Sequence, residues 1–202
     1  MPLLRCTEDE CGHEWYVRSM LAIGAACEEC GSDTVVVGID DNLPEHTPEL
    51  EIAHRAHPGY ARAKALRVAR EHGFVHPPVI VHSIARNLGF TIRQSHSLRT
   101  LRARLVGQVI EVNAAEPPVA QRFSVAHELG HHFLGTEHGG GEPAEREADA
   151  FAGELLVPGP MLREAMRKTT DVAALRARFK VSRDVLEIAA KHHRLSARLT
   201  GG

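Results

Sequence analysis

The chain has 202 residues, of which 43% are hydrophobic and 25% are charged, and its formal net charge is −2. This size supports one substantial core beside a small accessory module. The composition is that of a globular protein, and the near-neutral charge excludes a bulk positive field that would draw the whole chain onto nucleic acid. Direct nucleic-acid binding would need a local patch such as Arg99, Arg102 and Arg104, which we interpret as a solvated loop or strand face.

The first residues, MPLLRCTEDEC, lack the apolar segment of a secretory signal. No stretch of the sequence approaches the roughly 18 to 20 uninterrupted apolar residues of a membrane span. We therefore expect a cytoplasmic protein with no membrane partner. In that reducing compartment cysteines are better interpreted as metal ligands than as disulfides.

The four cysteines fall in two pairs, Cys6-x4-Cys11 and Cys27-x2-Cys30, and each pair is followed by glycine. Two such knuckles at this separation are typical of a zinc ribbon in which four thiolates hold one ion. Four protein ligands leave no open coordination position, so this zinc is expected to be structural. Residues 1–39 are thus predicted to form a zinc ribbon, which would serve as a docking surface or as an N-terminal stabiliser.

Residues 40–59 are acidic and rich in proline, which is typical of a linker, and residues 60–202 are predicted to form one domain. Its pattern predicts a helix over 60–72, a second from Pro77 and Pro78 to about residue 88, and two more over about 119–134 and 144–156. Short strands are expected over 90–93 and 106–112, and two or three short helices after residue 156. The order favours the α+β class, as a mainly helical domain with a small β-sheet.

The segment His127-Glu128-Leu129-Gly130-His131 has the HExxH pattern. Residues four apart lie on one face of a helix, so both imidazoles can reach one metal ion, and Glu128 lies beside the ion as a general base for water. Gly130 leaves room for a neighbouring helix. His132 points about 100° away from His131 on the helix and is set aside as a ligand.

A catalytic zinc site needs a third protein ligand and an open position. In the next helix, Glu145 and Asp149 fall on the apolar stripe, where a buried carboxylate needs a partner. We therefore predict Glu145 as the third ligand and Asp149 as the residue that orients a ligand histidine through its other ring nitrogen. The alternatives for the third ligand are Glu142, His138 and Glu147. The polar side of the same helix is predicted to carry Arg146, Glu147 and Glu154.

These residues resemble the ImmA/IrrE metallopeptidases, which have a gluzincin-like site. The matching segments are PPVIVHSIARNLGFTI, VIEVN, QRFSVAHELGHHFLG, EREADAFAGELLVP and ARFKVS, in the family's order over about 60–195. The resemblance implies a zincin-like domain with zinc on His127, His131 and Glu145, and with Glu128 catalytic. The family usually has Asn where this chain has Asp149, and both side chains can accept a hydrogen bond. The N-terminal ribbon looks like an added module.

The resemblance also implies a function: limited proteolysis of an XRE-type helix-turn-helix repressor, which relieves repression in stress, prophage or mobile-element circuits. The cofactors expected are one catalytic and one structural zinc. An extended substrate is expected to pair with the strand Gln108–Val112. The main alternative is a regulatory protein- or DNA-binding module with a structural or vestigial zinc site, in which ARFKVSRDVLEIAAKHH would recognise the partner.

Overall fold

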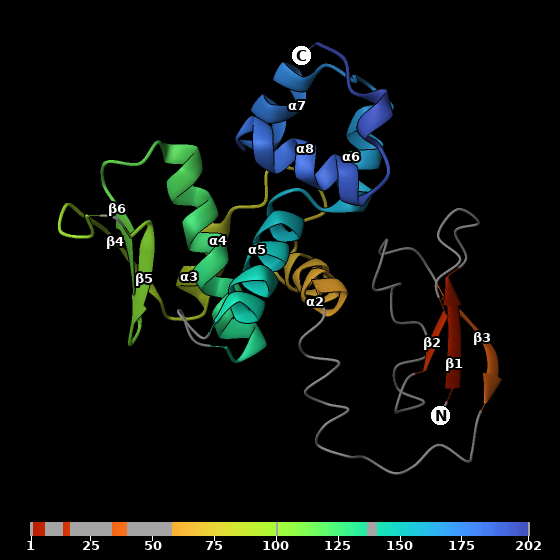
Figure 1. The fold of residues 1–202 in the computed structure, drawn as a ribbon, viewed down its shortest axis with the longest axis horizontal. Coiled ribbons are helices and arrows are strands. Elements are labelled where there is room, and N and C mark those ends of the chain that lie inside the picture. Colours follow the sequence, from red (N-terminus) through yellow and green to blue (C-terminus); the bar gives the residue numbers. More distant parts are fainter. Residues whose placement is uncertain are drawn as a thin grey trace.

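The computed structural model describes residues 2–6, 14–16, 34–39, 58–99, 101–136 and 141–201 (Figure 1). The first three ranges are strands β1 (Pro2–Cys6), β2 (Glu14–Tyr16) and β3 (Thr34–Ile39), which form an antiparallel sheet in the order β2-β1-β3. Cys6 ends β1, whereas Cys11, Cys27 and Cys30 lie outside the described residues. The zinc ribbon therefore stays a prediction.

From residue 58 onward the described chain is mainly helical. Its helices are α2 (Pro58–Glu71), α3 (Val81–Asn87), α4 (Pro118–Leu134), α5 (Glu142–Leu156), α6 (Gly159–Met166), α7 (Val172–Phe179) and α8 (Arg183–His192), followed by the 3-10 helix η2 (Ser196–Arg198). Its strands are β4 (Thr91–Ser95), β5 (Ala103–Val106) and β6 (Val109–Asn113). This arrangement confirms the predicted α+β, zincin-like class.

The sheet of this domain has the order β4-β6-β5, with β6 parallel to β4 and antiparallel to β5. Ile110 and Val112 of β6 are buried and belong to the core. The prediction of one strand over 106–112 was wrong, because Gly107, with a φ of 57°, begins a turn that separates β5 from β6. The predicted strand joined the last residue of β5 to β6 and missed the turn at Gly107 and Gln108 between them.

The core lies between the helices and the sheet. Helix α4 packs against α5 on one side and against β5 and β6 on the other, and α2 runs along α5 (Figure 1). The C-terminal helices α6 and α8 contact each other, and α8 also contacts α5. Leu129 of α4 and Phe151 and Leu155 of α5 are among the largest fully buried side chains. Burial of such side chains contributes roughly 1.5–3 kcal/mol each, so the α4–α5 pair is the centre of the fold.

Two helix boundaries differ from the predicted ones. Helix α3 begins at Val81 rather than at Pro77 or Pro78, which lie in the irregular segment before it. Helix α2 begins at Pro58, inside the segment predicted as linker, and its residues from Gly59 onward contribute to the buried core. A proline suits the first turn of a helix but does not by itself indicate whether the helix starts at that proline or after it.

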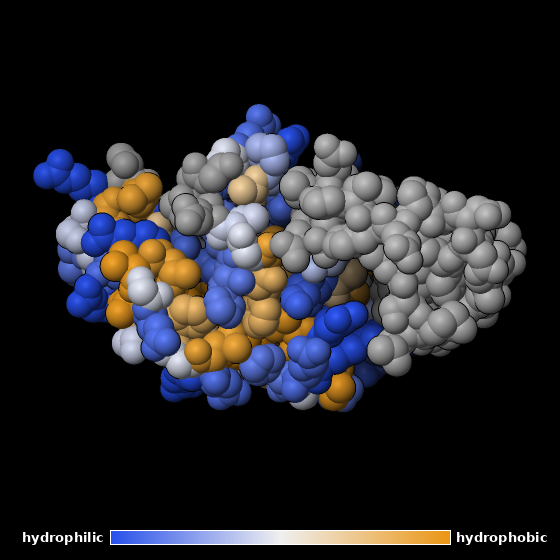
Figure 2. Space-filling model, turned by 90° about the horizontal axis from the view of Figure 1, so that it is seen from below, coloured by the Kyte–Doolittle hydropathy of each residue, from blue (hydrophilic) through white to orange (hydrophobic). Residues whose placement is uncertain are grey.

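The surface mixes hydrophilic and hydrophobic side chains. On the face seen from below, the hydrophobic ones gather towards the end that holds β4, β5 and β6 (Figure 2). The most exposed large hydrophobic side chains are Val75, Ile80, Leu101, Val106, Val119 and Ile188. Among the described residues, no helix is both long and apolar enough to cross a membrane.

Candidate metal centre

Helix α4 presents two histidines to one point in space. Pro118 occupies its first turn, and Gly135 ends it in the left-handed conformation with a φ of 66°. His127 and His131, one turn apart, direct their Nε2 atoms towards each other at a distance of 3.1 Å. Two ring nitrogens that both present lone pairs at this distance repel each other unless a cation lies between them.

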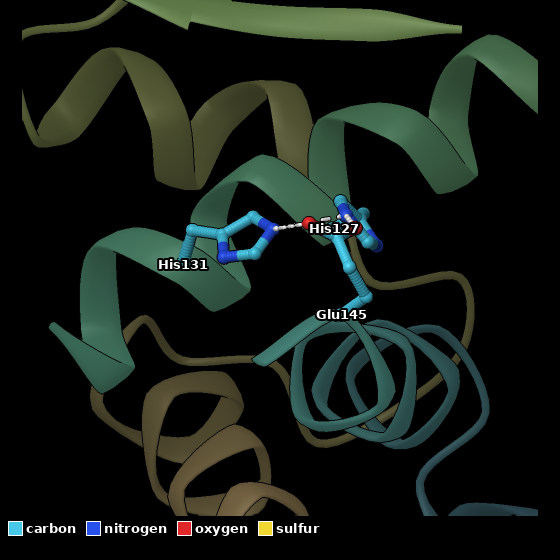
Figure 3. Close-up of side chains that lie close together, drawn as sticks. All are labelled: His127, His131 and Glu145. Carbon is cyan, nitrogen blue, oxygen red and sulfur yellow. Dashed lines mark hydrogen bonds and ion pairs between the residues drawn. The ribbon is translucent and has the colours of Figure 1, made fainter. Parts of the chain in front are cut away.

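Helix α5 brings a carboxylate to the same point (Figure 3). Glu145 Oε2 lies 3.2 Å from His127 Nε2, and Glu145 Oε1 lies 3.6 Å from His131 Nε2. Pro143 in the first turn of α5 starts the helix so that Glu145 faces α4. The ligand atoms of these three residues all lie within 4.8 Å of one another.

The spacing of these atoms fits a tetrahedral metal site. Zinc binds imidazole nitrogen and carboxylate oxygen at about 2.0–2.2 Å, which places neighbouring ligand atoms of a tetrahedron about 3.3 Å apart. The three observed separations, 3.1, 3.2 and 3.6 Å, surround this value. Two histidines and one carboxylate also form the donor set of open zinc sites that leave the fourth position for water. The residues present therefore fit a divalent metal ion such as zinc.

The second nitrogen of each histidine is also engaged. His127 Nδ1 lies 2.9 Å from Asp149 Oδ1, and His131 Nδ1 lies 2.9 Å from Thr136 Oγ1. With Nδ1–H donating to these oxygens, each ring is held in the tautomer that leaves the Nε2 lone pair for a metal. The backbone N–H of Thr136 also donates to the His131 carbonyl at 3.0 Å, so the turn after Gly135 is tied to this histidine twice.

Glu128 lies beside the two histidines without belonging to the three-residue group. Its side chain is buried, and it lines a cavity of about 230 Å³ together with His127 and Glu145. The remaining lining residues are Leu101, Arg102, Ala103, Phe123, Ser124 and Asp149. A carboxylate that faces the same cavity as the candidate metal ligands is suited to proton transfer there.

Acidic neighbours set the electrostatics of His127. Burial acts to lower the pKa of this imidazole, but the hydrogen bond from His127 to Asp149 and the charges of Asp149, Glu128 and Glu145 outweigh it and raise the pKa. The same negative charges favour a cation at the Nε2 atoms. Because a metal needs the neutral ring, protons and metal compete for this histidine, and metal binding is expected to weaken at acid pH.

The two helices that carry the ligands approach closely at a glycine. A Cβ atom added to Gly130 would lie 3.0 Å from the Ala148 Cα and 3.1 Å from the Ala148 carbonyl oxygen. Only glycine allows this backbone contact without a shift of one helix. We predicted from the sequence that Gly130 would leave room for a neighbouring helix, and α5 occupies that room. The close approach of the two helices determines how near Glu145 lies to the histidines.

A buried arginine anchors helix α4 from its other side. The Arg122 guanidinium donates to the carbonyl oxygens of Phe179 at 2.9 Å, Lys180 at 2.8 Å and Val79. The first two belong to the end of α7, whose last carbonyls have no partner within the helix. Burial lowers the pKa of Arg122 to about 10, so the group stays charged at neutral pH. This side chain ties the metal-site helix to the C-terminal helices.

Asn113, at the end of β6, holds the segment that closes the cavity. Its Nδ2 group donates to the carbonyl oxygens of Arg99 at 3.2 Å and Leu101 at 3.1 Å, and its backbone N–H donates to that of Arg102 at 2.9 Å. Leu101 and Arg102 both line the cavity beside the histidines. Asn113 is thus a positioning residue for one wall of the site.

The structure brings His127, His131 and Glu145 into one group, and it places Glu128 and Asp149 in the lining of the adjacent cavity. Of the alternative third ligands, Glu142 is exposed and lies outside the group, Glu147 is buried but is not part of it, and His138 lies outside the described residues. His132 contacts the edge of the Phe90 ring rather than the site.

Three predictions about the surroundings of the site were wrong. Glu147 and Glu154 are 4% exposed, not on a polar face, because α5 is covered by α2 and α8 as well as by α4. Asp149, expected on the apolar stripe, has a 59% exposed side chain at the rim of the cavity. Strand β6 is central and has neighbours on both sides, so Gln108–Val112 offers no free edge to a substrate.

Three residues that shape the site were not predicted. Thr136 follows the helix-ending Gly135, and its spacing of five from His131 was the available signal. Arg122 and Asn113 act through backbone carbonyls that are distant in sequence. No local pattern identifies such partners before the fold is known.

The sequence model of Peptidase_M78, the IrrE N-terminal-like domain, matches residues 86–191. This range covers just over half of the 202-residue chain and includes both helices that carry the site. The chain belongs to this family. The family is a class of zinc metallopeptidases that also has regulatory members. In the IrrE-like domain of this chain, the His127–His131–Glu145 group could hold a metal ion.

A solved structure described as a Mycobacterium tuberculosis transcriptional regulator superimposes with a TM-score of 0.51 at 21% sequence identity. The alignment covers 67% of this chain and 46% of that one, so the IrrE-like chain spans less than half the length of the regulator. At this identity the likeness shows a shared fold. No protein of curated function matches the chain.

Proposed function

We propose that the chain is a zinc-dependent endopeptidase that performs limited proteolysis. The observation that carries the proposal is the convergence of His127, His131 and Glu145 within 4.8 Å beside a cavity that Glu128 also lines. A site that served only structure would need neither the carboxylate of Glu128 in the cavity wall nor space beside the ligands. The sequence motif and the family both support this chemistry.

When bound, zinc supplies Lewis acidity, which lowers the pKa of water and polarises a peptide carbonyl. Glu128 takes the proton from the attacking water and later passes it to the amine that leaves. Asp149 and Thr136 hold the two imidazoles in the tautomer that this chemistry requires. Phe123 and Leu101 contribute apolar surface to the cavity and reduce its contact with bulk water.

The substrate is proposed to bind along β5 rather than β6. Strand β5 is at the edge of its sheet, and Ala103, its first residue, lines the cavity with His127 and Glu145. An extended peptide that pairs with a sheet edge gains backbone hydrogen bonds and a defined register. Residues Ala103–Val106 therefore replace Gln108–Val112 as the proposed docking strand.

The proposed substrate is a helix-turn-helix repressor of the XRE type, whose cleavage would relieve repression. The regulatory members of the family and the fold shared with a transcriptional regulator support a partner in transcription control. The competing proposal is a regulatory binding module whose metal site has no catalytic role. The cavity beside Glu128 favours the hydrolase.

The test is cleavage of an XRE-type repressor encoded beside this chain, incubated with the purified protein in zinc and followed by gel and mass spectrometry. We expect a single cut by the wild type and none by Glu128→Gln, which removes the base but keeps the three candidate ligands. Loss of a general base reduces turnover by about 10²–10⁴-fold. Glu142→Gln, at an 82% exposed carboxylate in the first turn of α5, is the matched control and should cleave normally.

Two outcomes would contradict the proposal. Cleavage by Glu128→Gln at the wild-type rate would remove Glu128 from the reaction. Tight binding of the repressor without any cut by the wild type, with zinc present, would favour the binding module. The proposed structural zinc of the ribbon is tested separately: substituting Cys27 and Cys30 by Ser should lower the zinc content by one ion per chain.

A further inference from the structure

A second group of two histidines and one glutamate lies at the opposite end of α5. It consists of Glu154, His192 and His193, whose ligand atoms all lie within 4.8 Å of one another. Glu154 is near the end of α5, His192 is the last residue of α8, and His193 follows it. Helix α5 thus carries Glu145 near its first turn towards one histidine pair and Glu154 near its last turn towards another.

The two histidine pairs have similar ring geometry. The ring centroids of His192 and His193 are 4.9 Å apart with planes at 70°, and those of His127 and His131 are 4.8 Å apart with planes at 78°. Adjacent residues do not normally share one face of a helix. Here His193 is the first residue after α8, with a φ of −83° and a ψ of 12°, and its departure from the helix lets both rings reach one point.

Glu154 is a buried, oriented carboxylate. Its side chain is 3% exposed, its Oε2 lies 2.8 Å from His193 Nε2, and its Oε1 accepts the backbone N–H of Gly159 at 2.8 Å. Both oxygens of this buried carboxylate are therefore held in fixed positions beside the two histidines.

The other ring nitrogen of His193 is buried beside Gly159. The His193 side chain is 1% exposed, and its buried Nδ1 has no hydrogen-bond partner among the described residues. The ring lies directly against Gly159, where an added Cβ would stand 2.4 Å from the His193 Cε1 atom. The protein thus keeps a glycine where any side chain would displace this imidazole. His192 is half-buried.

We propose that Glu154, His192 and His193 bind a divalent transition-metal ion, with zinc as the best fit to two imidazoles and a carboxylate. This ion is separate from the one proposed at His127, and the proposal does not rest on peptidase activity. Because Glu154 and His193 are almost completely buried, the ion is structural. It ties the end of α8 to α5 and to the first turn of α6.

The test uses the full-length protein, stripped with chelator, reloaded with zinc, desalted and analysed for metal content. His192→Ala is the decisive variant, because it removes one proposed ligand but leaves the Glu154–His193 hydrogen bond intact. We expect it to bind one zinc fewer per chain than the wild type, and Glu154→Gln to do the same. His76→Gln, at an exposed histidine outside both groups, is the matched control and should retain the full content.

Hydrogen exchange provides a second measurement. In the wild type, zinc should slow amide exchange at the end of α8 and the start of α6, and this protection should be absent in His192→Ala. Cobalt loading adds a spectroscopic test, since a site without thiolates contributes visible bands without sulfur charge-transfer bands. If His192→Ala and the wild type hold equal amounts of zinc, the group is a metal-free hydrogen-bonded pair and the proposal is wrong.

Discussion

Gly130 and Ala148 bring the backbones of α4 and α5 into direct contact, with an added Gly130 Cβ only 3.0 Å from the Ala148 Cα. The contact lies between the two helices that carry the candidate ligands, and it occurs one residue before His131 and three after Glu145. The distance between the histidines and the carboxylate therefore depends on a position that has no side chain.

Gly130→Ala should push the two helices apart. Overpacking of this kind lowers the free energy of unfolding by about 1–3 kcal/mol, which exceeds the gain of up to about 1 kcal/mol from the better helix propensity of alanine. We expect lower stability in urea and a higher zinc dissociation constant. Gly153→Ala is the control: it lies on α5 with nothing within 4 Å of an added Cβ, and it should stabilise the protein. Equal zinc affinity in both variants would show that the contact at Gly130 does not control metal binding.

Asp149 should act through His127. Asp149→Ala removes the acceptor of the His127 Nδ1 hydrogen bond, and such a loss typically weakens metal binding by about 10–100-fold. Asp149→Asn keeps an acceptor oxygen and should retain most of the affinity. The measurement is competition for zinc against a chromophoric chelator. An asparagine variant as weak as the alanine variant would show that the charge, rather than the hydrogen bond, matters.

Thr136 should act in the same way on His131. Thr136→Val preserves the shape of the side chain but removes the oxygen that lies 2.9 Å from His131 Nδ1. We expect weaker zinc binding with a far-ultraviolet circular dichroism spectrum like that of the wild type. Thr136→Ser should restore the affinity, because it returns the hydroxyl. Unchanged zinc affinity in Thr136→Val would show that the Thr136 hydroxyl does not orient His131 for metal binding.

Arg122 should be essential for stability. Arg122→Met leaves the carbonyl oxygens of Phe179 and Lys180 without this donor and removes one of two donors to the Val79 carbonyl. Each buried unsatisfied group costs about 1–3 kcal/mol. We expect the free energy of unfolding to fall by roughly 3 kcal/mol or more. Arg167→Met, at an exposed residue just after α6, should change it by less than about 0.5 kcal/mol. A small effect of Arg122→Met in chemical denaturation would contradict the anchoring role.

Glu111 should make stability depend on acid pH. Hydrogen bonds from Arg93 and from Arg104, the latter at 2.6 Å, hold the pKa of Glu111 below its ordinary value of 4.5. A pKa that is lowered on folding contributes stability above the ordinary value, and this contribution is lost as the pH falls through the folded pKa. The free energy of unfolding of the wild type, measured in urea, should therefore fall more steeply with decreasing pH than that of Glu111→Gln. Parallel pH profiles would show that the ion pairs of Glu111 with Arg93 and Arg104 do not contribute to stability.

The sequence was sufficient to place most of the helices and to predict which residues of α4 and α5 would meet. The spacing of His127 and His131 implies a shared helix face, and Pro143 and Pro158 frame α5 within two residues of its observed bounds. These features depend on local geometry, which a sequence records directly. The α+β class followed from the order of the same segments.

The errors arose where tertiary contacts decide burial. A helical wheel divides α5 into one buried and one exposed side, but α2, α4 and α8 cover it from several directions, so Glu147 and Glu154 are inside. Likewise the hydrophobic run over 106–112 does not reveal that Gly107 turns the chain and makes β6 central. Strand order is a property of the whole sheet and has no local signal.

Helix α2 lies outside the residues that the family model matches, although it runs along α5 and contributes Ala61, Ala65 and Val68 to the core. A fragment that began at residue 86, where the family match begins, would expose the side of α5 that α2 covers. It would also weaken the support of the helix that carries Glu145. The family model therefore matches only part of the packed domain, which begins upstream of the match with helix α2.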